Sequence, residues 1–182
     1  MLEEHPLDPA LHDRAGFSCG VPALDKYLLR FSAQHRRNGV STVYVLTDTE
    51  EPRTILGYYT LSAAQLETAE LAEANRSKLP RYPVPCFRMG RLASRSDRHG
   101  SGVGRTLVGL AVSRCLEARK QVAAFALIVD AKDASAKAFH EYYGFTGQVS
   151  ALVQHFFDVS VTKSQRYPNS HGEPLKGLEG RA

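Results

Sequence analysis

Apolar residues recur along the chain in two kinds of spacing, which alternate from segment to segment. Spacing of three and four residues, or residues that typically begin and end helices, marks the segments 22–34, 68–78, 104–120 and 133–143. Apolar runs rich in β-branched and aromatic residues mark 41–47, 54–62, 86–94, 122–129 and 151–162. The resulting order of helices and strands predicts an α/β fold with a mixed sheet.

The segment 122–129, VAAFALIV, is almost wholly apolar. This pattern is typical of a strand that is buried on both faces. The helix predicted next, 133–143, is followed by Gly144, a residue that accepts the left-handed backbone of a helix C-cap. We expect Phe145 to fold back onto that helix.

The chain has 182 residues, of which 43% are apolar and 23% are charged. These values fit one soluble domain, which we expect over residues 1–162, followed by a polar, mobile tail over 163–182. No apolar run approaches the ~20 residues of a membrane span. With no visible signal peptide and three scattered cysteines, we expect a cytoplasmic protein with no disulfide framework and no metal site.

The positive charge is concentrated in two segments, although the net charge is only +4. Between Arg76 and Arg105 there are eight basic residues, and Asp97 is the only acidic one. A second cluster consists of Arg30, His35, Arg36 and Arg37. Such segments favour anionic partners, either a phosphorylated cofactor or a nucleic acid, although each arginine could also serve solubility alone.

A glycine-rich turn, HGSGVG at 99–104, precedes the helix predicted at 104–120. Glycines allow a phosphate to approach the backbone, and the first amides of a helix attract anions. A Walker loop is excluded because Gly104-Arg105-Thr106 lacks its lysine, and the glycine spacing does not match a dinucleotide fingerprint. The pyrophosphate arm of coenzyme A and a turn without a ligand remain as interpretations.

The sequence around this turn resembles the GNAT superfamily of acetyl-CoA-dependent N-acetyltransferases. Gly102 and Gly104 match the last two positions of the family's Arg/Gln-x-x-Gly-x-Gly/Ala loop, and His99 stands where Arg or Gln is usual. The later motif, Asn-x-x-Ala-x-x-x-Tyr-x-x-x-Gly-Phe, is matched at Ala136, Gly144 and Phe145. Two departures are Asp133 for the asparagine and His140 for the tyrosine. The resemblance implies a GNAT fold: a central mixed, mostly antiparallel sheet flanked by helices, with a pyrophosphate site at the glycine loop.

Within that superfamily, the chain resembles the toxins of bacterial toxin–antitoxin pairs over residues 7–162. The segments that carry this resemblance are FSCGVPALDKYL, GYYTLS, KLPRYPVPCFRMGRLA and VDAKDASAKAFHEYYGF. It implies an enzyme that acetylates the amino group of aminoacyl-tRNA, a small ribbon-helix-helix antitoxin as partner, and possible homodimerisation. The alternatives are an N-acetyltransferase for a peptide or small amine, and a non-catalytic acyl-CoA-binding module.

The resemblance also implies which residues form the site. Acetyl-CoA would bind to Leu92, Ala93, Ser94, Arg98, His99, Gly100, Ser101, Gly102, Val103, Gly104, Arg105, Thr106, Asp133 and Phe139. The proton for the leaving thiolate would come from His140, at the family's tyrosine position, from Tyr143 on the same helix face, or from neither. The tRNA phosphates would bind to basic residues outside the cofactor loop, namely Arg36, Arg37, Lys78 and Arg81.

Overall fold

A computed structural model describes residues 1–68, 76–77, 79–131, 134–147 and 154–158. Its elements are β1 (Leu2–Pro6), α1 (Pro22–Lys26), η1 (Tyr27–Phe31), α2 (Ser32–Arg37), β2 (Thr42–Asp48), β3 (Gly57–Leu66), β4 (Val84–Ser94), η3 (Ser96–Arg98), α4 (Val103–Arg119), β5 (Ala126–Asp130), α5 (Ala134–Tyr142), β6 (Thr146–Gly147) and β7 (Gln154–Asp158). The predicted tail, 163–182, lies outside the described residues.

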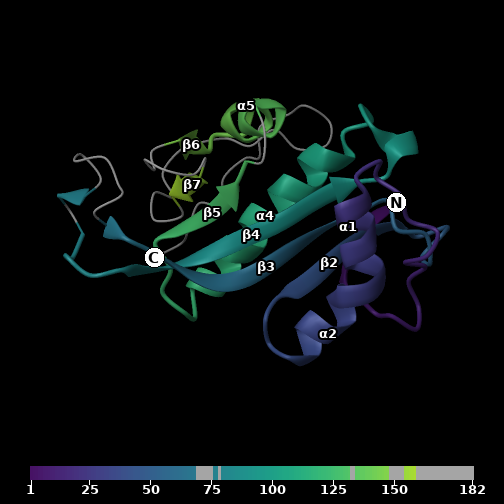
Figure 1. The fold of residues 1–182 in the computed structure, drawn as a ribbon, viewed down its shortest axis with the longest axis horizontal. Coiled ribbons are helices and arrows are strands. Elements are labelled where there is room, and N and C mark those ends of the chain that lie inside the picture. Colours follow the sequence, from purple (N-terminus) through teal and green to yellow (C-terminus); the bar gives the residue numbers. More distant parts are fainter. Residues whose placement is uncertain (69–75, 78, 132–133, 148–153, 159–182) are drawn as a thin grey trace, which may run out of the picture.

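The strands form one seven-stranded sheet in the order β1-β2-β3-β4-β5-β7-β6. Among the strands that the structure describes, only the central β4–β5 pair is parallel, and every other neighbouring pair is antiparallel. The predicted mixed, mostly antiparallel sheet flanked by helices is therefore confirmed. In Figure 1, α1 and α2 lie in front of the sheet and α4 lies behind it.

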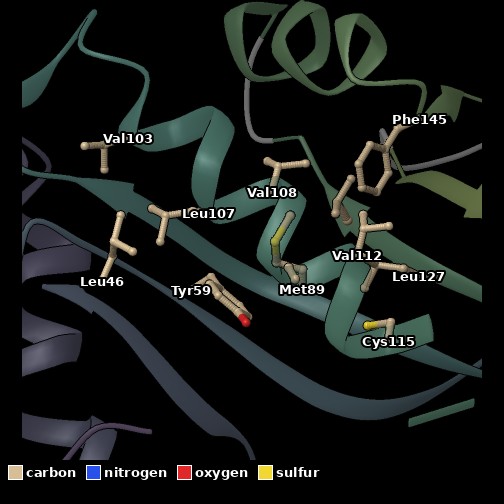
Figure 2. Close-up of a cluster of buried hydrophobic side chains, with 12 residues drawn as sticks. Leu46, Tyr59, Met89, Val103, Leu107, Val108, Val112, Cys115, Leu127 and Phe145 are labelled. Carbon is tan, nitrogen blue, oxygen red and sulfur yellow. The ribbon is translucent and has the colours of Figure 1, made fainter. Parts of the chain in front are cut away.

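The larger core cluster fills the space between the sheet and α4. Leu107, Val108 and Val112 of α4 pack against Met89 of β4 and Leu127 of β5, as Figure 2 shows. A Cβ at Gly57 on β3 would lie 2.8 Å from Leu107 Cδ1 and 2.9 Å from the Ala93 carbonyl oxygen. The absence of a side chain at Gly57 thus lets the first half of α4 approach the sheet closely.

The opposite face of the sheet carries α1 and η1. Tyr27 and Leu28 of η1 pack there with Val43, Val45 and Tyr58 of the sheet. The predicted helix over 22–34 therefore exists, but it contains a π-helical turn in which the Ser32 N–H bonds to the Tyr27 carbonyl, five residues earlier. The sheet is therefore sandwiched between two helical layers, one on each face.

Several boundaries differ from the sequence predictions. Strand β1 was not expected, because a five-residue segment with two glutamates carries little apolar signal. Strand β5 begins at Ala126 rather than Val122, whose side chain is 67% exposed. Most of the helix expected over 68–78 lies outside the described residues.

The end of α5 follows the sequence prediction closely. Gly144 has φ +85°, its N–H bonds to the Glu141 carbonyl, and the Phe145 N–H bonds to the His140 carbonyl. These two bonds are those of a Schellman motif. They turn the buried Phe145 ring back against the helix, 5.5 Å from the His140 ring.

None of the helices in the described part of the chain is both long and apolar enough to cross a membrane.

Candidate active site

A β-bulge in β4 is the structural origin of the site. Thr60 pairs with Arg91 and Leu61 pairs with Met89, so Gly90 is an extra residue on β4. Met89 faces α4, whereas Ala93, four residues on, packs in the cluster on the α1 face. In a regular strand these two side chains would share a face. The bulge therefore places each side chain after Gly90 on the opposite face of the sheet from the one that regular alternation would give.

The two central strands separate just where this bulge lies. Parallel pairing of β4 with β5 runs from Cys86↔Ala126 to Met89↔Val129 and then stops. Beyond it, Gly90–Ser94 of β4 keeps β3 as a neighbour but has no described strand on its other side. We call the place where β4 and β5 separate the split. The backbone N–H and C=O groups of this stretch are available to a ligand there, and the stretch includes Leu92, Ala93 and Ser94.

The glycine loop lies after the free end of β4 and leads into α4. Gly100 and Gly102 have φ values of +79° and +87°, which favour glycine. Ser101 Oγ donates to the Arg98 carbonyl at 2.6 Å, and Thr106 Oγ1 donates to the Gly102 carbonyl at 3.2 Å. The loop is therefore folded by its own short-range bonds.

The outer surface of this loop is open. A Cβ at Gly100 or Gly102 would meet no atom within 4 Å. Gly102 is the N-cap of α4, and no side chain caps the helix there. The amides of Val103, Gly104 and Arg105 open the helix, where N–H groups lack intrahelical partners and the helix dipole favours an anion. This arrangement fits the pyrophosphate of coenzyme A.

Two further expected cofactor residues, His99 and Phe139, connect the glycine loop and α4 to neighbouring elements. His99 is exposed, and its Nε2 lies 3.2 Å from the Ser94 carbonyl oxygen, which ties the loop to the end of β4. Phe139 of α5 lies over the start of α4, with its Cζ 3.4 Å from where a Cβ of Gly104 would be. Arg98 is exposed, and Asp133 lies outside the described residues.

The two candidate proton donors occupy different environments on α5. His140 is 6% exposed, between the rings of Phe139 and Phe145, each with its centroid 5.5 Å away. Tyr143 is partly exposed and packs against Phe139 at 4.9 Å. Burial raises the pKa of Tyr143, and the nearby positive charge of Arg105 lowers it by less. Tyr143 therefore remains a protonated phenol near the start of α4.

The basic residues expected to contact a nucleic acid lie away from the glycine loop. Arg36 and Arg37 are exposed at the end of α2, where Arg36 Nη1 donates to the Leu7 carbonyl at 2.5 Å. Arg81 is exposed in the segment that leads into β4. Lys78 lies outside the described residues.

Sequence reasoning missed the side chains at the mouth of the split. Arg88 Nη1 lies 3.7 Å from Asp130 Oδ2, which bridges β4 and β5 where they separate. Arg91 projects toward the α1 face, with its guanidinium 3.8 Å from the centroid of the Tyr27 ring. Both arginines were recognised only as part of a basic segment, because neither the bulge that orients Arg91 nor the point where β4 and β5 separate has a clear sequence signal beyond Gly90.

Other potentially reactive groups near the sheet are buried. The three cysteines are buried and free, and burial raises the pKa of Cys19 to about 11 and that of Cys115 to about 12. Tyr58 donates to the Leu24 carbonyl and Tyr59 to Glu4, and burial raises the pKa of both phenols. These groups stabilise the fold, and none of them is a ready nucleophile.

The split between two parallel central strands, next to a glycine loop that opens a helix, defines a GNAT acetyltransferase. A scan against protein-family models finds no match. A tRNA-acetylating toxin of Mycobacterium tuberculosis is 30% identical over 133 residues, 73% of this chain and 78% of that protein. The chain belongs to this family of acetyltransferase toxins.

Solved structures agree with that assignment. AtaT complexed with acetyl-methionyl-tRNAfMet superimposes with a TM-score of 0.82 at 30% identity, covering 88% of this chain and 96% of that one. A tyrosine-to-phenylalanine variant of AtaT, bound to acetyl-CoA and the C-terminus of the antitoxin AtaR, gives a TM-score of 0.75 at 28% identity. The coverage in that case is 87% of this chain and 94% of the AtaT chain.

Proposed function

We propose that this protein is a toxin that transfers the acetyl group of acetyl-CoA to the amino group of aminoacyl-tRNA. The observation that carries the proposal is the split after Met89, which adjoins an open glycine loop on one side and a basic helical layer on the other. The M. tuberculosis relative is named for acetylating tRNA, and AtaT has been solved with an acetylated aminoacyl-tRNA.

The cofactor would bind along β4 and the start of α4. The amides of Gly102 to Arg105 would receive the pyrophosphate, with Gly100, Ser101, Arg98 and Thr106 around it. Leu92, Ala93 and Ser94 would bind the pantetheine arm and the thioester through their backbone groups, and Phe139 would pack beside the arm. Acetyl-CoA supplies the acetyl group as an activated thioester.

The chain need not supply a strong base for this reaction. A free α-amino group has a pKa of roughly 8, so a fair fraction is neutral near pH 7.5. Backbone amides in the split would polarise the thioester carbonyl and position it for attack. The thiolate that leaves would take a proton from α5, and His140 and Tyr143 are the two candidate donors.

The remaining partners follow from the same assignment. Arg36, Arg37, Lys78 and Arg81 would bind tRNA phosphates, and a small ribbon-helix-helix antitoxin would neutralise the enzyme. AtaT has been solved with the C-terminus of its antitoxin, which supports a partner of this kind. We further propose that residues 1–162 act as one domain in the cytoplasm, where charged tRNA is found.

The test is to incubate the purified chain with acetyl-CoA labelled in the acetyl group and with aminoacylated tRNA. Label should appear on the amino acid of charged tRNA and be absent from the same tRNA after deacylation. Expression without an antitoxin should arrest growth. Label found only on protein or free amines, with normal growth, would contradict the toxin assignment and leave a general N-acetyltransferase.

A further inference from the structure

A row of one arginine and three ring-bearing side chains leads from the split toward the surface of the α1 face. The Arg91 guanidinium lies 3.8 Å from the Tyr27 ring centroid. The His35 ring lies edge-on to Tyr27, with 5.4 Å between centroids, and Phe31 lies 6.4 Å from His35. We call these four residues, Arg91, Tyr27, His35 and Phe31, the aromatic row.

The inner end of the row is next to the reaction site. Arg91 belongs to the stretch of β4 that has separated from β5, and it is adjacent to Leu92. The bulge turns Arg91 to the α1 face, opposite the face on which α4 would bind the cofactor. An amine that attacks the thioester has to arrive from the face that α4 does not cover, which is the face of Arg91.

The outer end of the row is exposed and positively charged. Phe31 is 40% exposed at the end of the π-helical turn, a feature that often marks functional sites. Arg30, Arg36 and Arg37 are exposed on the same helical segment. The sequence has no acidic residue between Asp25 and Asp48. In the part of the chain that the structure describes, no carboxylate forms an ion pair with Arg91.

Single-stranded nucleic acid is the ligand that suits such a surface. Unpaired bases stack on aromatic rings and on guanidinium planes, while nearby cations bind the phosphates. We propose that the aromatic row binds the single-stranded 3′ end of charged tRNA, with bases stacked on Phe31 and His35 and a phosphate or base at Arg91. The proposal rests on the proposed function and assigns the surface that guides the aminoacyl end into the split.

The decisive variant is Phe31→Ala, compared with Leu29→Ala as a matched control. Leu29 is 42% exposed on the same turn but is not part of the row. Loss of one stacked base should raise KM for charged tRNA about tenfold. It should also weaken inhibition by the uncharged trinucleotide CCA by a similar factor. Phe31→Tyr should retain wild-type KM, and acetyl-CoA affinity should be unchanged in all three variants.

Salt dependence separates stacking from phosphate binding. A stacking defect reduces affinity by the same factor at 50 and 200 mM salt, whereas a lost phosphate contact lowers the salt slope. Unchanged KM in Phe31→Ala, or an equal rise in Leu29→Ala, would overturn the aromatic row while the proposed function stands. If the wild-type chain acetylates no charged tRNA, the proposed function itself fails.

Discussion

Glu4 of β1 and Arg114 of α4 form an ion pair across 110 residues of sequence. Tyr59 donates to the same carboxylate, and the Arg114 guanidinium lies 4.0 Å from the centroid of the Tyr44 ring. The Glu4 side chain is only 10% exposed. This contact joins the strand at the edge of the sheet to the helix that carries the candidate cofactor loop.

Glu4→Gln should lower the free energy of unfolding by about 1–3 kcal/mol, because it removes the charge that satisfies two partly buried donors. Urea denaturation of the purified chain measures this difference. Glu3→Gln is the control, since Glu3 is about half exposed and its substitution should change stability by about 0.5 kcal/mol or less. Equal urea midpoints for Glu4→Gln and Glu3→Gln would show that the contact between Glu4 and Arg114 does not contribute to the stability of the fold.

Gly102→Glu and Gly104→Glu should abolish acetyl-CoA binding, because each places a side chain and a negative charge where the pyrophosphate is proposed to lie. At Gly102 the positive φ adds a strain of ~1–2 kcal/mol. Gly39→Glu controls for that strain, since Gly39 also has positive φ and open space around it but lies outside the loop. Calorimetry that gives wild-type affinity in the folded Gly102 and Gly104 variants would contradict the cofactor site.

His140→Ala and Tyr143→Phe should separate the two candidate proton donors. The true donor should lose about 10²–10⁴ in kcat, while the other variant should keep near wild-type kcat. If His140 is the donor, His140→Tyr, which restores the family's usual residue, should recover part of the rate. Stopped-assay release of CoA measures each rate, and normal turnover in both variants would mean that the donor is not on α5.

Arg36→Gln combined with Arg37→Gln should abolish growth arrest and leave acetyl-CoA affinity unchanged. Each lost phosphate contact should reduce the salt slope of tRNA binding by about one. Lys78→Gln combined with Arg81→Gln should act in the same way. Arg53→Gln combined with Lys120→Gln removes the same charge elsewhere on the surface, and equal loss of toxicity in that control would indicate a general charge effect.

His12 should make stability depend on pH. Burial lowers the pKa of His12 from 6.5, His5 lowers it further, and the Asp8 N–H donates to the unprotonated Nδ1 at 2.9 Å. Because the folded pKa is the lower one, this stabilisation is present above pH 6.5 and is lost as the pH falls through the folded value. The free energy of unfolding should therefore fall more steeply between pH 7 and 5 in the wild type than in His12→Gln. Parallel curves would refute the effect.

The sequence predicted the parts of the fold that carry regular periodicity. The α4 stripe, the apolar β5 and the Gly144 cap all produce local patterns that are independent of distant partners. Strand β1 has no such pattern, because it is stabilised by pairing with β2 and by the contacts of Glu4 with Tyr59 and Arg114. Non-local contacts of this kind leave no sequence pattern within a window of about ten residues.

The same distinction between local patterns and non-local contacts applies to the candidate site. The glycine loop and α5 were found because they resemble continuous motifs, whereas the positions of Arg91 and Asp130 depend on the bulge and on where the strands separate. The π-helical turn was also missed, since residues 22–34 read as an ordinary helix. The aromatic row joins Arg91 to residues of that turn and α2, so only the folded chain brings it together.

The bulge at Gly90 makes the length of β4 as important as its composition. Inserting one residue between Gly90 and Arg91, with the bulge kept, would exchange the faces occupied by Arg91 and Leu92. An apolar side chain would then line the acceptor side, and a guanidinium would press into the core beneath α4. Insertions and deletions in β4 should therefore be excluded during evolution more strictly than substitutions, and natural variation in chain length should fall in the turns on either side of it.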